Sequence, residues 1–181
     1  GNASGSFQIV AGGVSIHDLV ADVTPRGKVR FTLVKQFVPE RRLRICGLSN
    51  SRRFIINKNG LDLNDIKAQL DNGESAADEA YFTQLASLSL ENSVFVDCTA
   101  SADIAFKYMN LFKRGYSVVA CNKITFSLPY VQYAALKEAA IEIGATLRYE
   151  TTVGAALPIL ESISRSVHSG DEIVRIEAVL S

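Results

Sequence analysis

The feature that most constrains this chain is the alternation of short apolar segments with longer amphipathic ones from residue 43 onward. Val94–Cys98 (VFVDC) and Tyr116–Cys121 (YSVVAC) are nearly all apolar, as strands are when both faces of a parallel sheet are covered. Between them, Ala102–Phe112 has apolar residues at helical spacing and ends at two cations and a glycine. The alternation predicts right-handed crossovers and an α/β fold, a doubly wound parallel sheet with helices on both faces.

The same pattern predicts the remaining elements. They are strands at 43–48, 146–151 and 172–180, and helices at 62–70 (with Asp62 as its cap), 77–88, 128–143 and 157–167. Before residue 43 the pattern leaves alternatives open: a strand at 7–10, a short helix at 16–23, and either a strand or a helix at 29–38. The first six residues, GNASGS, resemble a tag remnant or flexible leader, so a single domain is expected over 7–181.

The composition excludes several classes of protein. The chain carries 19 basic and 19 acidic residues, and a nucleic-acid-binding surface normally requires a basic excess. Its three cysteines are widely spaced and form no CxxC pair, so neither a zinc ribbon nor a disulfide framework is indicated, and a reducing cytoplasmic compartment is expected. No apolar run reaches membrane-spanning length and no signal peptide is visible, so we expect neither a nucleic-acid nor a membrane partner.

Ligands of such sheets bind at the carboxyl ends of the strands, and the sequence places polar residues there. Thr99, Ala100 and Ser101 follow the strand at 94–98 and precede a predicted helix, which favours a phosphate or another anion. The alternative is that they only cap this helix. Cys98 lies in the same cluster and Cys121 ends the next strand, so the two cysteines are expected to be neighbours, with buried packing as their role.

Two further clusters carry cationic or amide side chains. Asn122 and Lys123 follow a buried strand, and a lysine there could reach a phosphate, a carboxamide or a substrate carbonyl; the alternative is a solvated loop lysine. Arg52 and Arg53 follow the strand at 43–48, where dinucleotide-binding folds meet the adenine ribose. With no acidic residue at 48–53, they favour NADP over NAD, although a solvated basic pair would have the same sequence.

Residues 149–159 (YETTVGAALPI) predict a strand end, a tight turn and a helix start. Together with VDCTAS, VVACNK and SGDEIVRIEAVLS, in that order and spacing, this stretch resembles homoserine dehydrogenase, specifically the dehydrogenase half of the bifunctional aspartokinase–homoserine dehydrogenases. The resemblance runs from about residue 29 to 181. It implies a Rossmann-like NAD(P)-binding domain of an enzyme of threonine and methionine biosynthesis that interconverts L-homoserine and L-aspartate-4-semialdehyde by hydride transfer, as a homo-oligomer when intact.

The resemblance also implies roles for individual residues. Thr99 and Lys123 match positions that contact the nicotinamide nucleotide, and Lys123 is the candidate that approaches the reacting carbon. The expected cofactor-binding set is Arg52, Arg53, Thr99, Ala100, Ser101, Asn122 and Lys123. A monovalent cation, most simply sodium, is implied at the Glu150 carboxylate and the backbone carbonyls of Val153, Ala155 and Leu157, with Ala156 where the family pattern has glycine.

Two departures from the family pattern limit this interpretation. The family opens with a strand followed by GxGxxG, whereas this chain has Gly12-Gly13 and Gly27 without that spacing, and residues 29–38 resemble the first helix without its loop. The substrate and dimerisation domain that carries the main proton-transfer residues would follow residue 181. We therefore expect no homoserine turnover by this chain alone. A non-catalytic binding or assembly module that retains the fold without the phosphate loop remains the alternative function.

Overall fold

The computed structural model describes residues 5–11, 19–23, 29–33, 43–76, 79–154 and 157–179, with side chains from residue 44 onward. Its strands are β1 (Gly5–Ala11), β2 (Leu19–Val23), β3 (Val29–Leu33), β4 (Leu43–Asn50), β5 (Arg53–Ile56), β6 (Glu74–Ser75), β7 (Ser93–Asp97), β8 (Ser117–Ala120) and β9 (Leu147–Arg148). Its α-helices are α1 (Ile66–Asp71), α2 (Ala80–Ser87), α3 (Ala102–Ala105), α4 (Tyr108–Phe112), α5 (Tyr130–Ile143) and α6 (Ile159–His168). Two 3₁₀ turns cover Thr125–Ser127 and Glu150–Thr152.

Seven of these strands form one sheet in the order β6-β5-β4-β1-β7-β8-β9. The pairs β7–β8 and β8–β9 are parallel, with Asp97 opposite Ala120 and Val118 opposite Leu147. Strands β7 and β8 are buried as the apolar runs predict, most completely at Phe95, Val96 and Val118. The predicted α/β, Rossmann-like class is therefore confirmed, with its parallel part at β7-β8-β9.

Strand β1 is inserted antiparallel between β4 and β7. Gly5 pairs with Asn50 and Ala11 with Leu43 on one side, while Ser6 pairs with Asp97 on the other. Because β1 is antiparallel to both neighbours, β4 and β7 run in the same direction, as the sequence predicts for these two strands. The start of β1, not its end, consequently lies at the carboxyl ends of β4 and β7.

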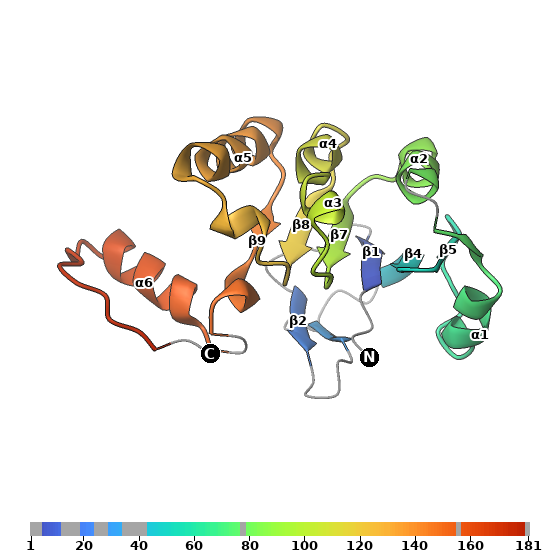
Figure 1. The fold of residues 1–181 in the computed structure, drawn as a ribbon, viewed down its shortest axis with the longest axis horizontal. Helices are drawn as coiled ribbons and strands as arrows, with labels where there is room; N and C mark the ends of the chain where they lie inside the picture. The colour runs from blue at the N-terminus through green and yellow to red at the C-terminus, as the bar shows by residue number, and fades with distance from the viewer. Residues whose placement is uncertain are drawn as a thin grey trace.

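Helices α2, α4 and α5 stand in a row along one side of this sheet, and the separate β2–β3 hairpin lies on the other side (Figure 1). The core between helices and sheet contains the fully buried rings of Phe54, Phe95, Tyr108 and Phe112. The α5 helix ends at Gly144, whose φ of +73° closes the helix in the left-handed conformation that glycine adopts readily. This end is the one that the sequence predicts.

Several predicted elements are wrong in type or extent. Residues 19–23 form a strand, so the short helix expected at 16–23 is wrong over these residues. Of the two alternatives at 29–38, the strand is the one that forms over 29–33, where it pairs with 19–23. Positions 16–18 and 34–38 lie outside the described residues. The helix expected at 62–70 begins only at Ile66, after Asp65, because Asp62 Oδ1 accepts the Asn64 amide at 2.9 Å in a local turn that precedes the helix.

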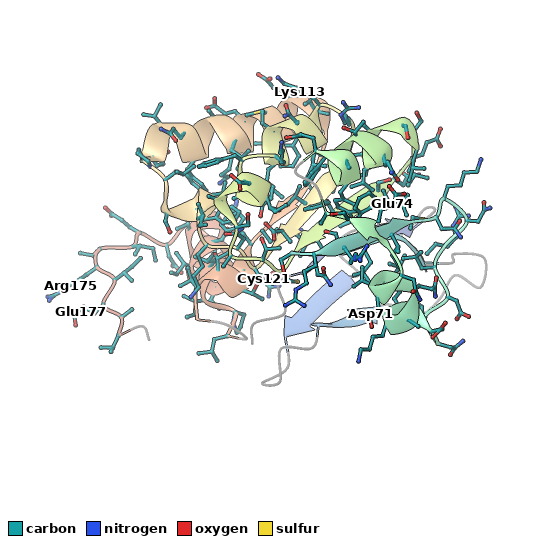
Figure 2. The ribbon with its side chains drawn as sticks, turned by 45° about the vertical axis from the view of Figure 1, so that its right-hand side comes forward. Asp71, Glu74, Lys113, Cys121, Arg175 and Glu177 are labelled. Carbon is teal, nitrogen blue, oxygen red and sulfur yellow. The ribbon has the colours of Figure 1, made fainter. Side chains whose placement is uncertain are left out.

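Two further differences concern segments near the candidate site. The helix expected at 102–112 is divided at Lys107, whose N–H bonds to the Ile104 carbonyl three residues back and tightens the turn. The strand expected at 146–151 shortens to β9, and Glu150 lies in a 3₁₀ turn. The strand expected at 172–180 does not form over 171–179, where Val174 and Val179 are 90% and 103% exposed (Figures 1 and 2).

Candidate functional site

The carboxyl ends of β4 and β7 face a cleft of about 660 Å³. Its wall combines the end of β4, the helix α2 and the turn between β7 and α4, represented by Ser49, Asn50, Ser51, Glu79, Tyr81, Phe82, Thr99, Ser101 and Lys107. Lys107 and Glu79 form an ion pair at its edge. A cleft at this end of the strands is where α/β sheets bind ligands.

A buried carboxylate organises the end of β7. Asp97 is fully buried; its Oδ2 accepts the Tyr108 hydroxyl at 2.5 Å and the Asn122 amide at 3.0 Å, and its Oδ1 accepts the Thr99 N–H at 2.7 Å. The pKa of Tyr108 is raised above its ordinary value, mainly by burial and also by the adjacent Asp97 carboxylate. The phenol therefore stays protonated and can donate its hydrogen bond. The network joins the strand end to the helix behind it and to the neighbouring loop.

The Thr99–Ser101 turn lies directly on this network. The Ser101 N–H donates to Thr99 Oγ1 at 3.2 Å, and Ser101 Oγ accepts the Ile104 N–H at 3.5 Å as the cap of α3. Thr99 and Ser101 line the cleft, whereas Ala100 is exposed. The cap that the sequence offers as an alternative is thus present. Because α3 has only four residues, its dipole contributes less to anion binding than the predicted eleven-residue helix would.

Asn122 and Lys123 differ sharply in environment. Asn122 is 1% exposed; its amide donates to the Ser101 carbonyl at 2.9 Å as well as to Asp97, and its Oδ1 accepts the Ile124 N–H at 3.1 Å. Its polar atoms are therefore used to connect the two strand-end loops. Lys123 is exposed on the same loop and is not among the residues that line the cleft.

Arg52 and Arg53 form a tight turn after β4. Asn50 Oδ1 accepts both of their backbone N–H groups at 2.8 Å, and both side chains are exposed. The Arg53 guanidinium donates to the Gly73 carbonyl at 3.0 Å. Asn50 and Ser51 line the cleft, whereas Arg52 and Arg53, which follow them in the chain, are not among its lining residues.

Glu150 caps α6. Its Oε1 accepts the Leu160 N–H at 2.8 Å and its Oε2 accepts the Glu161 N–H at 3.0 Å, so the carboxylate faces the positive end of that helix. Among the implied cation ligands, the Leu157 carbonyl accepts the Ile159 N–H at 2.9 Å, and Ala155 lies outside the described residues. Within the described ranges, no group of three or more His, Cys, Asp or Glu side chains is placed to hold a metal ion.

The sequence pattern did not identify Asp97 and Tyr108 as part of the site. The available signal was one acidic residue at the end of an otherwise apolar strand, since a buried carboxylate requires partners. Cys98 and Cys121 are neighbours, as expected, and interact through their thiols. Cys121 also accepts a hydrogen bond from Thr151 Oγ1 at 3.2 Å.

The sequence of residues 26–150 matches the family profile described as the homoserine dehydrogenase NAD-binding domain. The chain belongs to the homoserine dehydrogenase family. Similar proteins include the bifunctional aspartokinase/homoserine dehydrogenase of Haemophilus influenzae, 35% identical over 140 residues, and a chloroplastic counterpart of Arabidopsis thaliana, 36% identical over 141 residues. Both alignments cover 77% of this chain but only 17% and 16% of the relatives.

Solved structures agree with the fold of this homoserine dehydrogenase domain. The crystal structure of the Thermoplasma acidophilum homoserine dehydrogenase has a TM-score of 0.53 at 23% identity and covers 70% of this chain and 40% of that one. A Candida auris protein of unknown function has a TM-score of 0.58 at 25% identity, covering 68% and 35%. Among the described residues, no helix is both long and apolar enough to cross a membrane.

Proposed function

We propose that the cleft at the carboxyl ends of β4 and β7 binds the nicotinamide dinucleotide of a homoserine dehydrogenase. The observation that carries the proposal is the cleft itself, which joins the end of β4, at Ser49–Ser51, to the hydroxyl-rich turn after β7, at Thr99 and Ser101. In a dinucleotide-binding sheet these two places receive the adenine ribose and the phosphates. Thr99 and Ser101 would face the phosphates, Ala100 would offer backbone only, and Lys123 would reach toward the nicotinamide end.

The reversed direction of β1 changes how the pyrophosphate would be held. A glycine-rich phosphate loop follows the carboxyl end of the first strand. Here that end of β1 lies at the opposite end of the strands from the cleft, where Ala11 pairs with Leu43 and Val10 pairs with Ser93. The end of β1 that a phosphate loop would follow is therefore not the end that lies at this cleft; Gly12 and Gly13 themselves lie outside the described residues. We expect the affinity for the dinucleotide to be lower than in relatives that have the loop.

NADP is the proposed form of the cofactor, with Arg52 as the principal contact to the 2′-phosphate. The Arg53 guanidinium already donates to the Gly73 carbonyl. Among the described residues, the Arg52 guanidinium has no hydrogen-bond or ion-pair partner. A charge-assisted bond from arginine to a phosphate contributes about 1.5–3 kcal/mol. Arg52→Ala should weaken NADPH binding by that amount and leave NADH binding unchanged, with Arg53→Ala as the matched variant of smaller effect.

Titration of the purified chain with NADPH, followed by nicotinamide fluorescence, tests the proposal. We expect saturable binding that Arg52→Ala weakens. The absence of saturable binding would favour the second candidate, a non-catalytic assembly module. The specific observation in favour of that module is the antiparallel β1 in the central position of the sheet.

The oxidoreductase activity belongs to the intact enzyme in this proposal, and homoserine or aspartate semialdehyde would be bound by a following domain, in a homo-oligomer. Hydride transfer requires a positioned substrate and a general base beside it. In this proposal, Lys123 is the side chain of this chain that approaches the reacting carbon. Homoserine-dependent NADP reduction by the 181-residue chain alone would refute this assignment of roles. The proposed location is the cytoplasm or, as for the chloroplastic relatives of plants, a plastid.

A sodium ion beside Glu150 is the remaining part of the proposal. The two helix N–H groups occupy about two of the four lone-pair positions of the carboxylate, so a cation can share it. The carbonyls of Val153, Ala155 and Leu157 would complete the oxygen ligands. Equal melting temperatures in sodium and in a bulky organic cation, at the same ionic strength and for wild type and Glu150→Gln, would leave Glu150 as a cap only.

A further inference from the structure

Cys98 and Cys121 directly follow the ends of two adjacent parallel strands, β7 and β8. They are the residues immediately after the registered pair Asp97 and Ala120, and the Cys121 N–H still donates to the Asp97 carbonyl at 2.8 Å. Paired residues on neighbouring strands lie about 4.8 Å apart and present their side chains to the same face. Disulfides join Cα atoms separated by roughly 4.4–6.8 Å, and the spacing of adjacent strands lies within this range.

The two thiols also differ in the chemical state that their surroundings favour. The hydrogen bond from Cys98 lowers the pKa of Cys121 to about 7, and the Thr151 hydroxyl adds to this effect, whereas burial opposes it. The pKa of Cys98 is raised, mainly by the same hydrogen bond and to a smaller degree by burial. Cys121 is therefore the thiolate of the pair and Cys98 the proton donor. Both are partly exposed, unlike Cys46, which is fully buried.

We propose that Cys98 and Cys121 form a redox-active dithiol at the ligand-facing edge of the sheet, which low-molecular-weight disulfides oxidise to an intrachain disulfide. The Cys121 thiolate attacks one sulfur of the reagent disulfide and displaces its first thiolate. Cys98 then loses its proton to solvent, attacks the Cys121 sulfur and displaces the second thiolate. The two cysteines lose two electrons, and the reagent is reduced to two thiols.

The position of the pair makes this modification relevant to the cleft. Cys98 precedes Thr99, and Cys121 precedes Asn122, whose amide joins the two loops. A disulfide would fix the separation of these loops covalently. Figure 2 shows Cys121 in the centre of the molecule, whereas Lys113 marks the outer side of the helix row. The proposal stands on the strand register and does not require that a nucleotide binds.

Oxidised glutathione is the probe that tests it. The purified chain is incubated with it, quenched in acid, unfolded and alkylated with N-ethylmaleimide. We expect wild type to retain one alkylatable thiol, with a mass about 2 Da below the reduced form before alkylation because two hydrogens leave. Cys46→Ser should oxidise equally and retain none. Cys98→Ser should stop as a glutathione adduct of Cys121, and Cys121→Ser should react about tenfold more slowly, since it lacks the low-pKa thiolate.

Peptide mapping of wild type gives a reading that does not depend on whether a variant folds. Trypsin places the three cysteines on separate peptides, because basic residues lie between each pair, and the expected product links 68–107 to 115–123. Three free thiols after incubation, a stable glutathione adduct on wild type, or a crosslink that includes Cys46 would each overturn the proposal.

Discussion

Two buried tyrosines of similar exposure should respond in opposite directions to the same substitution. Tyr108 is fully buried and its hydroxyl donates to the Asp97 carboxylate at 2.5 Å. Tyr81 is 4% exposed, and within the described part of the chain its buried hydroxyl has no hydrogen-bond partner. Tyr108→Phe removes a bond, whereas Tyr81→Phe removes an unsatisfied polar group. The pair therefore separates the contribution of the hydroxyl from that of the ring.

The magnitudes follow from the partners. A hydrogen bond to a charged group contributes about 1.5–3 kcal/mol, and Tyr108→Phe leaves Asp97 with the Asn122 amide and the Thr99 N–H as its remaining donors. We expect the free energy of unfolding to fall by roughly 2 kcal/mol, which for a chain of this size lowers Tm by about 4–8 °C. Burial of an unpaired hydroxyl costs about 1–3 kcal/mol, so Tyr81→Phe should be neutral or stabilising.

Thermal and urea unfolding of wild type and both variants, followed by circular dichroism, provide the measurement. Equal m-values should accompany the shifts, since neither substitution changes the surface exposed on unfolding. If Tyr81→Phe destabilises as much as Tyr108→Phe, the loss is one of ring packing and the assignment of the Asp97 network is wrong. A neutral Tyr108→Phe would lead to the same conclusion.

Three further predictions concern the turn after β9 and the thiol pair. Glu150→Gln should lower the free energy of unfolding by about 1 kcal/mol and speed hydrogen exchange at the Leu160 and Glu161 amides, because it removes a charged cap; unchanged exchange there would contradict the cap. Gly154→Ala should destabilise by more than about 1 kcal/mol, because φ is +70° and the new Cβ would lie 2.1 Å from Ile159 Cδ1; a wild-type Tm would refute this. Alkylation of Cys121 by iodoacetamide should be half-maximal near pH 7, since its pKa falls from 9.0 to about 7, and Cys98→Ala, which removes the hydrogen-bond donor, should move the midpoint upward.

The parallel half of the fold could be predicted because its signals are local. The apolar runs of β7 and β8 and the α5 stop at Gly144 each depend on composition within a short window. The direction of β1 could not, because a strand pattern carries no information about which neighbours it pairs with or in which sense. Residues 172–179 have the composition of a strand, but they pair with none of the described strands and form no regular structure.

The site was predictable to the same degree. The sequence placed Thr99, Ser101 and Arg52 at strand ends, and the structure locates Thr99 and Ser101 in the wall of one cleft, with Arg52 outside its lining. For Glu150 the sequence supported both a cation ligand and a helix cap, and only the distances to two amides identify the cap. Asp97 was missed because its importance arises from Tyr108 and Asn122, which are distant in sequence and are brought to it by folding.

The central position of β1 also makes the sheet divisible. In the described sheet, β4 and β7 are hydrogen-bonded to each other only through β1, so its absence would leave a β6-β5-β4 half and a β7-β8-β9 half, each with an open edge. Open edges recruit other strands. A truncated chain lacking residues 1–11 should self-associate, and a synthetic peptide of residues 5–11 added in trans should act as a donor strand and restore the monomer. The two halves of the described sheet are thus joined by a single strand of seven residues, β1.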